Sequence, residues 1–180
     1  DIIKKLVNEN IIKINKVNKY RINIDNNSFK KKELTLEQKE TVDKVEESFN
    51  KSEIFLLHGV TGSGKTEVYM ELIEKVVKTG KCAILLVPEI SLTHQIVSRF
   101  YSRFGSDVAI FHSALSDGEK YDEYQKIYKG EVRIVVGTRS AIFTPLQNIG
   151  LIILDEEHSS TYKQESTPKY NAIDIAKWRG

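Results

Sequence analysis

The chain has 180 residues, of which 40% are hydrophobic and 29% charged, so it can bury a core and fits one globular domain with an appendage. No apolar stretch approaches the roughly 20 residues that cross a membrane, and the first residues lack a signal-peptide core, so we expect a cytoplasmic protein with no membrane partner. The single cysteine, Cys82, excludes a zinc site built from cysteines. The net charge of +2 hides an asymmetry, because residues 1–33 carry 9 Lys or Arg against 4 Asp or Glu and the rest carries 18 against 21.

The first 33 residues form a separate, basic leader. Apolar residues at helical spacing predict a helix over 1–8, and alternation predicts a small hairpin between Ile12 and Ile24. Residues 1–24 cannot bury a core of their own, and 25–33, with Asn-Asn-Ser and three lysines, predict a basic linker. The leader fits either an arm that approaches nucleic acid or a solvated linker, and its charge does not decide between them.

From residue 34 to residue 180, predicted helices alternate with predicted strands. The expected helices cover 36–50, 65–78, 92–104, 117–128 and 172–178, and the expected strands cover 54–58, 82–88, 108–112, 132–137 and 150–155. This order predicts an α/β fold with a mostly parallel sheet and helices on both faces, with ligands at the carboxyl ends of the strands. The last helix still runs where the sequence stops, so we expect a piece of a longer protein.

The most informative motif is a phosphate-binding loop between the first strand and the second helix. The pattern G-x-x-x-x-G-K-[ST] is matched in full by Gly59, Val60, Thr61, Gly62, Ser63, Gly64, Lys65 and Thr66. Backbone N–H groups of such a loop point at phosphate oxygens, the lysine reaches the outer phosphates and the hydroxyl ligates Mg²⁺. The sequence therefore predicts a nucleoside triphosphate and Mg²⁺ as ligands, against the plainer alternative of a glycine turn that binds nothing.

Two acidic residues follow the last strand, at the same edge of the sheet as the loop. Asp155 is expected to hold Mg²⁺ from the opposite side, and Glu156 to orient or deprotonate the attacking water. Lys65, Asp155 and Glu156 are therefore the candidate catalytic residues, and Thr66 and Asp155 the candidate metal ligands. An acidic helix start favoured by the helix dipole is the structural alternative.

Polar residues also follow the other strands, over 88–93, 112–116 and 137–140. Small residues there expose N–H groups that suit a phosphodiester backbone, and Arg139 can pair with a phosphate. Ordinary helix caps at Ser91 and Thr93 and a satisfied polar His112 remain open as alternatives.

Five motifs together resemble the bacterial primosomal, replication-restart DNA helicases of superfamily 2: GVTGSGKTEVY at 59–69, LVPEISLTHQ at 86–95, HSALS at 112–116, GTRSAIFTP at 137–145 and LDEEHSSTYKQ at 154–164. The resemblance implies a RecA-like P-loop lobe preceded by the end of a winged-helix domain in 1–24. It implies an ATP-dependent helicase of 3′-to-5′ polarity that acts on forked or single-stranded DNA in the bacterial cytoplasm, at the nucleoid. Primosome proteins and single-stranded-DNA-binding protein are the implied partners, and the family's zinc module lies outside this chain.

The resemblance also assigns individual residues. Gln38 matches the glutamine that reads adenine, Glu67 belongs to the nucleotide motif, and 162–170 match an aromatic-rich loop that couples DNA binding to hydrolysis. The residues expected to bind DNA or to couple it to hydrolysis are Glu89, Thr93, His112, Ser113, Thr138, Arg139, Ser140, His158, Tyr162, Lys163, Lys169 and Tyr170. The chain departs from the family pattern at His94, where a proline is usual, and at Ile173, where an arginine is usual.

Two-lobed motors place ATP between the lobes, and the second lobe supplies an arginine finger. By this resemblance, 34–180 form the first lobe only, and we expect the isolated chain to hydrolyse ATP hardly at all. Two other classes stay open from the sequence: a P-loop phosphotransferase acting on a small molecule, and a DNA- or partner-binding module with a structural nucleotide.

Overall fold

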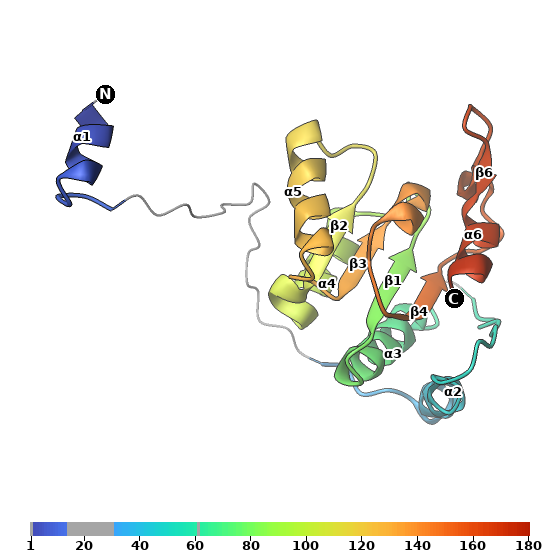
Figure 1. Cartoon of the computed structure of the whole chain (residues 1–180). Coiled ribbons are helices and arrows are strands. Elements are labelled where there is room, and N and C mark those ends of the chain that lie inside the picture. The colour runs from blue at the N-terminus through green and yellow to red at the C-terminus, as the bar shows by residue number, and fades with distance from the viewer. Residues whose placement is uncertain (1, 14–30, 61) are drawn as a thin grey trace.

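The computed structural model describes residues 2–13, 31–60 and 62–180 (Figure 1). In the leader, Ile2–Asn8 forms helix α1, as expected, and this helix buries none of its residues. The second strand of the predicted hairpin and residues 25–30 of the predicted linker lie outside the described residues, so the winged-helix assignment stays a prediction.

Four parallel strands form the central sheet: β1 (Cys82–Leu86), β2 (Val108–Phe111), β3 (Ile134–Gly137) and β4 (Ile149–Leu154), in the order β2-β3-β1-β4. The register pairs Leu86 with both Gly137 and Leu154, so these strands end at one edge. Since the strands are joined by helices, the chain has the α/β, mostly parallel architecture predicted for a RecA-like lobe (Figure 1). All functional motifs that follow these strands are thereby gathered at one side of the sheet.

Helices cover both faces of this sheet. On the two faces lie α3 (Lys65–Lys78), α4 (His94–Phe104), α5 (Asp117–Tyr128) and α6 (Ala172–Arg179), and α2 (Leu36–Glu46) lies outside them. Short 3₁₀ turns occupy Gly105–Asp107, Arg139–Phe143 and Ser160–Tyr162, and a small antiparallel pair joins β5 (Lys163–Gln164) to β6 (Tyr170–Asn171). No helix of the described residues is long and apolar enough to span a bilayer.

The strands alternate their side chains between two cores, as the period of two in a strand requires. Leu85 faces a core that is closed by Met70 of α3 and Phe100 of α4. Leu86, the next residue, faces a second core that is closed by α5, the 139–143 turn and α6, with Ile142 fully buried there. The sheet is therefore sandwiched, and α2 packs on the outer side of α3 rather than on the sheet.

Local sequence signals set several of the helix starts. Thr35 and Gln38 form a capping box at the start of α2, and Ser116 and Glu119 form another at α5. In each case the cap hydroxyl accepts a bond from the N3 backbone N–H, so one of the orphan donors at the helix start is satisfied.

The predicted strand over 54–58 is wrong, because residues 52–60 have no regular secondary structure. The run Ile54–Leu57 is apolar enough for a buried strand, but Ile54 is 78% and Leu56 80% exposed. Only Leu57 of this run packs, with Leu151 of β4, against the cores around α3. A strand of a parallel sheet needs a backbone partner and cover on both faces, and among the described residues this run has cover on one side only. β4 is correspondingly left at the edge of the sheet, with all six of its residues only half-buried.

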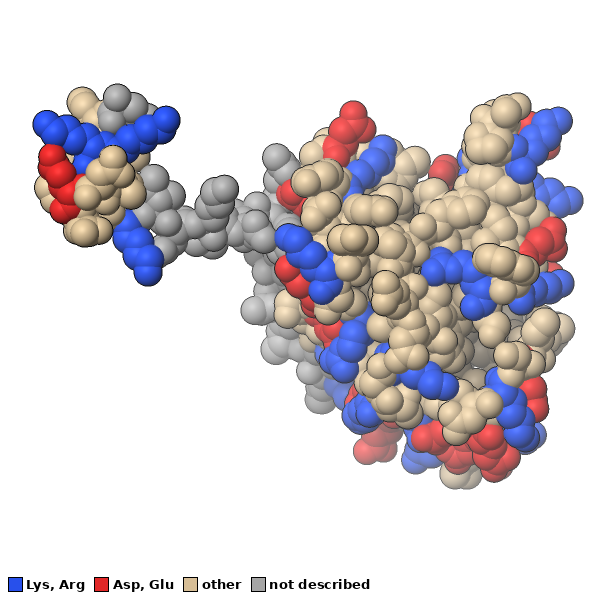
Figure 2. Space-filling view, viewed as in Figure 1, with Lys and Arg blue, Asp and Glu red and all other residues tan. Residues whose placement is uncertain are grey.

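Charged side chains on the face shown in Figure 2 are mixed in sign. Lys and Arg lie among acidic residues there, and a wide central area is neither acidic nor basic. On this face, the described residues form no continuous basic band of the kind that a large electrostatic contact with nucleic acid would use.

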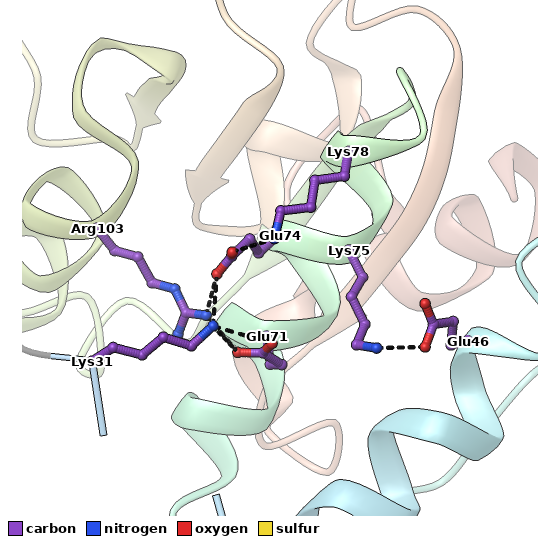
Figure 3. A network of polar contacts seen from close by, with 7 residues as sticks. All are labelled: Lys31, Glu46, Glu71, Glu74, Lys75, Lys78 and Arg103. Atoms are coloured by element: carbon purple, nitrogen blue, oxygen red, sulfur yellow. Dashed lines mark hydrogen bonds and ion pairs between the residues drawn. The ribbon is translucent and has the colours of Figure 1, made fainter. Parts of the chain in front are cut away.

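An ionic network fastens α3 to its surroundings (Figure 3). Glu71 and Glu74 of α3 both accept hydrogen bonds from Arg103 of α4, at 2.7 and 2.5 Å, and both pair with Lys31. Burial raises the pKa of the Glu74 carboxyl, but hydrogen bonds from Lys78, Arg103 and Lys31 outweigh burial and lower it to about 2. Lys75 reaches Glu46 of α2 in the same view. Ion pairs therefore fasten α3, the helix that follows the glycine loop, to α2, to α4 and to Lys31.

Candidate functional site

The glycines of the predicted phosphate loop are required by backbone geometry. Gly62 and Gly64 have φ of 82° and 84°, in the left-handed region that L-residues rarely adopt. A Cβ on Gly64 would also lie 2.5 Å from Nε2 of Gln38. The loop is consequently a tight turn that leads directly into α3, which begins at Lys65.

Lys65 is the first residue of α3, and its side chain folds back over the loop. Its Nζ donates to the carbonyl oxygens of Gly59 at 2.7 Å and Val60 at 3.0 Å. The ammonium thus lies above the loop and at the positive end of a 14-residue helix, where an anion is favoured. Thr66 follows on the same turn and is half-buried, whereas Thr61 lies outside the described residues.

Gln38 joins the start of α2 to this loop. Its side-chain Nε2 donates to the Ser63 carbonyl at 3.0 Å, and its Oε1 accepts from the Thr35 N–H at 3.0 Å. The predicted adenine reader therefore lies beside the phosphate loop, as its assignment requires. Both ends of its amide are used within the protein here, so adenine recognition stays a prediction.

The acidic box begins where β4 ends. The Asp155 N–H donates to the Leu86 carbonyl at 2.9 Å, so the residue is still fixed to β1. Glu156 has a φ of 49°, a left-handed conformation that is uncommon for a residue with a side chain and is concentrated at functional sites. Its N–H donates to Oδ1 of Asp155 at 3.1 Å, and its side chain is exposed. The turn thus separates the two carboxyl groups, one fixed and one facing solvent.

Tyr69 connects the two halves of the predicted site. This residue is 7% exposed, and its hydroxyl donates to Oδ1 of Asp155 at 3.1 Å. Burial raises the pKa of Tyr69, and the nearby Asp155 and Glu156 charges raise it further, so the hydroxyl stays protonated. Sequence reasoning missed this contact, although Tyr69 is four residues after Lys65 and therefore on the same face of the helix.

The donor atoms present fit Mg²⁺ and a nucleotide phosphate chain. Thr66 and Asp155 offer a hydroxyl and a carboxylate, the hard oxygen ligands that Mg²⁺ takes, usually one or two from the protein beside phosphate oxygens and water. The described residues contain no cluster of three or more His, Cys, Asp or Glu side chains, as a dedicated protein cage would need. The arrangement therefore fits a metal that arrives with a nucleotide, held by Thr66 and Asp155 with Lys65 at the phosphates.

Glu67 has a different neighbourhood from the one expected of a nucleotide contact. Its carboxylate is paired with Arg99 of α4, and the residue is 8% exposed. Its Oε2 is buried and finds no hydrogen-bond partner among the described residues. The side chain thus braces α3 against α4, and a role at the nucleotide stays a prediction.

Tyr162 ties the aromatic-rich loop to the acidic box. The residue is 1% exposed, and its hydroxyl lies 2.5 Å from the Asp155 carbonyl oxygen and 3.1 Å from that of Leu86. Tyr170, at the other end of the loop, packs edge-on against Phe143 with 4.8 Å between ring centroids. Both aromatic residues face the protein here, so their position suits coupling better than direct contact with DNA.

Arg139 points at this same loop. Its Nη1 donates to the carbonyl oxygens of Thr161 at 3.2 Å and Lys163 at 3.0 Å. The neighbouring Thr138 is 3% exposed. In this structure neither side chain is free on the surface to meet a phosphate, and the phosphate contact expected for them stays a prediction.

The remaining predicted DNA contacts lie on the carboxyl edge of the sheet. Ser113 donates to Glu89 at 3.3 Å, and Thr93 caps α4 by accepting from the Ile96 N–H, which is the alternative left open for it. His112 is half-buried, and burial lowers its pKa. Of the others, Ser140 is half-buried, and the exposed ones are His158, Lys163 and Lys169. The structure brings these residues to one side of the sheet but does not test their contact with DNA.

Comparisons with known proteins place the chain in a family. Residues 31–178 match the family described as "Type III restriction enzyme, res subunit". The chain is 54% identical over 179 residues to a "Replication restart protein PriA" of Bacillus subtilis, covering 97% of this chain and 22% of that protein. The PriA of Synechocystis is 57% identical over 125 residues (69% of this chain, 15% of that protein), and that of Chlamydia pneumoniae 49% over 152 (83% and 20%).

The chain thus spans about a fifth of the length of these curated relatives. A solved structure titled "Sulfolobus solfataricus SWI2/SNF2 ATPase C-terminal domain" is similar with a TM-score of 0.40 and 18% identity, covering 67% of this chain and 75% of that one. This likeness is too distant to carry an argument.

Proposed function

The chain belongs to the family described as type III restriction enzyme, res subunit, and from this premise we propose that it is the ATP-binding lobe of a DNA helicase that acts in replication restart. Its similarity to replication restart proteins over most of its length supports the process, and the phosphate loop supports the chemistry. The whole protein would be an ATP-dependent helicase of 3′-to-5′ polarity. Its substrates would be forked or single-stranded DNA.

One observation carries the proposal furthest: the Tyr69 hydroxyl of α3 donates to the Asp155 carboxylate beyond β4. This bond places the acidic box against the helix that begins at Lys65. A glycine turn and an acidic helix start that had nothing to do with one another would not need this contact. The contact therefore supports a site in which a phosphate-binding half and an acidic half, both of which nucleotide hydrolysis requires, lie together.

Within this site each residue has a distinct role. The loop N–H groups and Lys65 bind and orient the phosphates. Thr66 and Asp155 would hold Mg²⁺, which neutralises charge on the phosphate oxygens when it is bound. Glu156 would orient the attacking water and take up its proton, from an exposed position on a strained turn.

Communication with DNA would pass through the aromatic-rich loop at 162–170 together with the 3₁₀ turn that precedes it, called here the 160–170 loop. Tyr162 contacts the backbone of Asp155, and Arg139 contacts the backbone of the loop on both sides of Tyr162. A displacement of this loop by DNA would therefore act directly on the residue that precedes Glu156. Primosome proteins and single-stranded-DNA-binding protein would be the partners, a zinc module would lie elsewhere in the whole protein, and the location would be the bacterial nucleoid.

Residues 1–180 on their own would hydrolyse ATP hardly at all. In P-loop enzymes an arginine finger contributes about 10³ to 10⁵ in rate. Here Arg139 is engaged with the 160–170 loop, and Arg179 donates to carbonyl oxygens of Ile142 and Leu146 on the opposite side of the sheet from α3. Neither of these two arginines is placed to reach a phosphate on the loop.

Calorimetric titration of Mg-ADP tests the nucleotide site. Lys65→Ala should abolish most binding, because it removes the charge complement of the phosphates. Lys78→Ala, at the exposed far end of the same helix, is the matched control and should bind like the wild type. In the full-length protein, ATP turnover with and without forked DNA tests the helicase assignment. Equal Mg-ADP affinity for Lys65→Ala and wild type would show that the loop is not part of the nucleotide site. Phosphorylation of a metabolite without stimulation by DNA would favour a phosphotransferase.

A further inference from the structure

We propose that Tyr69 is a positioning residue for nucleotide-bound Mg²⁺: its hydroxyl fixes the Asp155 carboxylate so that one oxygen is left to the metal. The inference rests on the proposed function and goes beyond it, because neither the phosphate-loop pattern nor the acidic box assigns a role to this side chain. It concerns a residue that acts through Asp155 and does not itself touch the nucleotide.

The backbone N–H, the backbone carbonyl oxygen and one carboxylate oxygen of Asp155 are each hydrogen-bonded within the protein. Its N–H donates to the Leu86 carbonyl, and its own carbonyl accepts from the Tyr162 hydroxyl. Its Oδ1 accepts two hydrogen bonds, from the Tyr69 hydroxyl and from the Glu156 N–H, each at 3.1 Å. None of the described residues hydrogen-bonds to Oδ2. The carboxylate is therefore oriented with one oxygen fixed and the other available.

Tyr69 can hold this position because its ring is fixed by packing. The residue is 7% exposed and belongs to the core that α3 and α4 form on the sheet, beside Met70 and Phe100. It also lies one turn after Lys65 on the same helix, so the phosphate-binding end of α3 and the hydroxyl move as one body. A rigid donor on the phosphate-binding element sets the distance between the two half-sites.

A group that hydrogen-bonds to a metal ligand helps to orient that ligand toward the metal. Removing such a partner typically costs 10- to 100-fold in metal affinity or activity, because the ligand loses its orientation. The alternative is that Tyr69 is only a core residue whose hydroxyl happens to reach a carboxylate. These readings differ in one measurable quantity, the gain in nucleotide affinity that Mg²⁺ provides.

The test uses Tyr69→Phe, which keeps the ring and removes the hydroxyl. Tyr101→Phe is a matched control, because Tyr101 is 6% exposed in the same core and its buried hydroxyl has no hydrogen-bond partner among the described residues. Binding of a fluorescent ADP analogue is titrated in excess Mg²⁺ and in EDTA, on chains whose thermal midpoints are compared first. Tyr69→Phe should reduce the Mg²⁺-dependent gain about 10-fold and leave the affinity in EDTA unchanged, whereas Tyr101→Phe should change neither.

A second measurement separates action through Asp155 from a local packing defect. In an Asp155→Asn background, Tyr69→Phe should cause no further loss of the Mg²⁺-dependent gain, since residues that act as a unit are not additive. A further loss there, an equal loss in EDTA, or a Tyr69→Phe chain that retains the wild-type gain would each overturn the inference. If the wild-type chain itself gains nothing from Mg²⁺, the proposed function fails, and the role of Tyr69 that rests on it fails with it, whereas a Tyr69→Phe chain that keeps a wild-type gain overturns the role of Tyr69 alone.

Discussion

The largest stability effect that we expect comes from Glu123, a carboxylate buried in the middle of α5. The residue is 0% exposed, its Oε2 accepts from the Ile110 N–H of edge strand β2 at 2.9 Å, and its Oε1 is paired with Lys126. Glu123→Ala removes one partner of the buried Lys126 ammonium, and breaking a buried ion pair costs about 3–5 kcal/mol. It also leaves the Ile110 donor without its acceptor, for which about 1–3 kcal/mol is usual. The two losses share one carboxylate and overlap, so we expect about 4–5 kcal/mol in total.

Two further variants make this expectation specific. Glu123→Gln keeps an acceptor for Ile110 and loses only the charge, so it should cost about half as much. In Glu123→Leu/Lys126→Met both charges are gone, and this double variant should be more stable than Glu123→Ala, because a buried pair replaced by apolar groups is often nearly neutral.

Urea denaturation followed by circular dichroism gives the free energies of unfolding. A typical domain has about 5–15 kcal/mol in total, so Glu123→Ala should move the midpoint far below that of the wild type. A loss of under about 1 kcal/mol would refute the reasoning, because it would mean that the carboxylate and its partners reach water in the folded chain.

Three other changes test separate parts of the molecule. Glu156→Gly should raise the free energy of unfolding by about 1 kcal/mol, because it removes a left-handed glutamate, yet should nearly abolish turnover of the full-length protein; a variant that hydrolyses ATP normally would show that Glu156 is not the group that activates water. Because Glu74 has a pKa of about 2 in the folded chain against an ordinary value of 4.5, its contribution to stability is complete above about pH 5 and is lost as the pH falls toward 2. Glu74→Gln should therefore flatten the decline in stability over that range, and an unchanged acid titration by circular dichroism would contradict the pairing with Arg103. Arg139→Met in the full-length protein should lower DNA-stimulated turnover more than basal turnover and leave the salt slope of DNA binding unchanged; a slope reduced by about one would instead identify a phosphate contact.

The parts of the fold that depend on local chemistry could be predicted from the sequence. The loop pattern that ends in Lys65 and Thr66 fixes both a turn with positive φ and the start of α3, and the Ser116 and Glu119 capping box marks the start of α5 within a residue. In these cases the residues that determine the structure are close together in the sequence. The parallel sheet and its two-sided core follow from the alternation of helices with strands, which is nearly as local.

The parts that depend on distant partners could not be predicted. The apolar run at 54–58 satisfies every local criterion of a strand, yet the described residues do not pair with it. Likewise, the bond from Tyr69 to Asp155 depends on how a helix lies over a strand 86 residues away, which no periodicity reports. Buried Glu123 lies in a helix of polar appearance, and its contacts with Ile110 and Lys126 explain why a charge is tolerated there.

The edge of β4 with which no described residue pairs also affects how we expect this chain to behave in solution. Its sequence, Ile-Gly-Leu-Ile-Ile-Leu, has no charged residue, no proline and high strand propensity, the composition that lets one polypeptide template another. Lysines or prolines that would discourage such pairing are absent from the strand itself. At high concentration we therefore expect two copies of the chain to pair by backbone hydrogen bonds along this edge. A single lysine in place of a half-buried isoleucine of β4 should prevent this association, which turbidity of the solution measures.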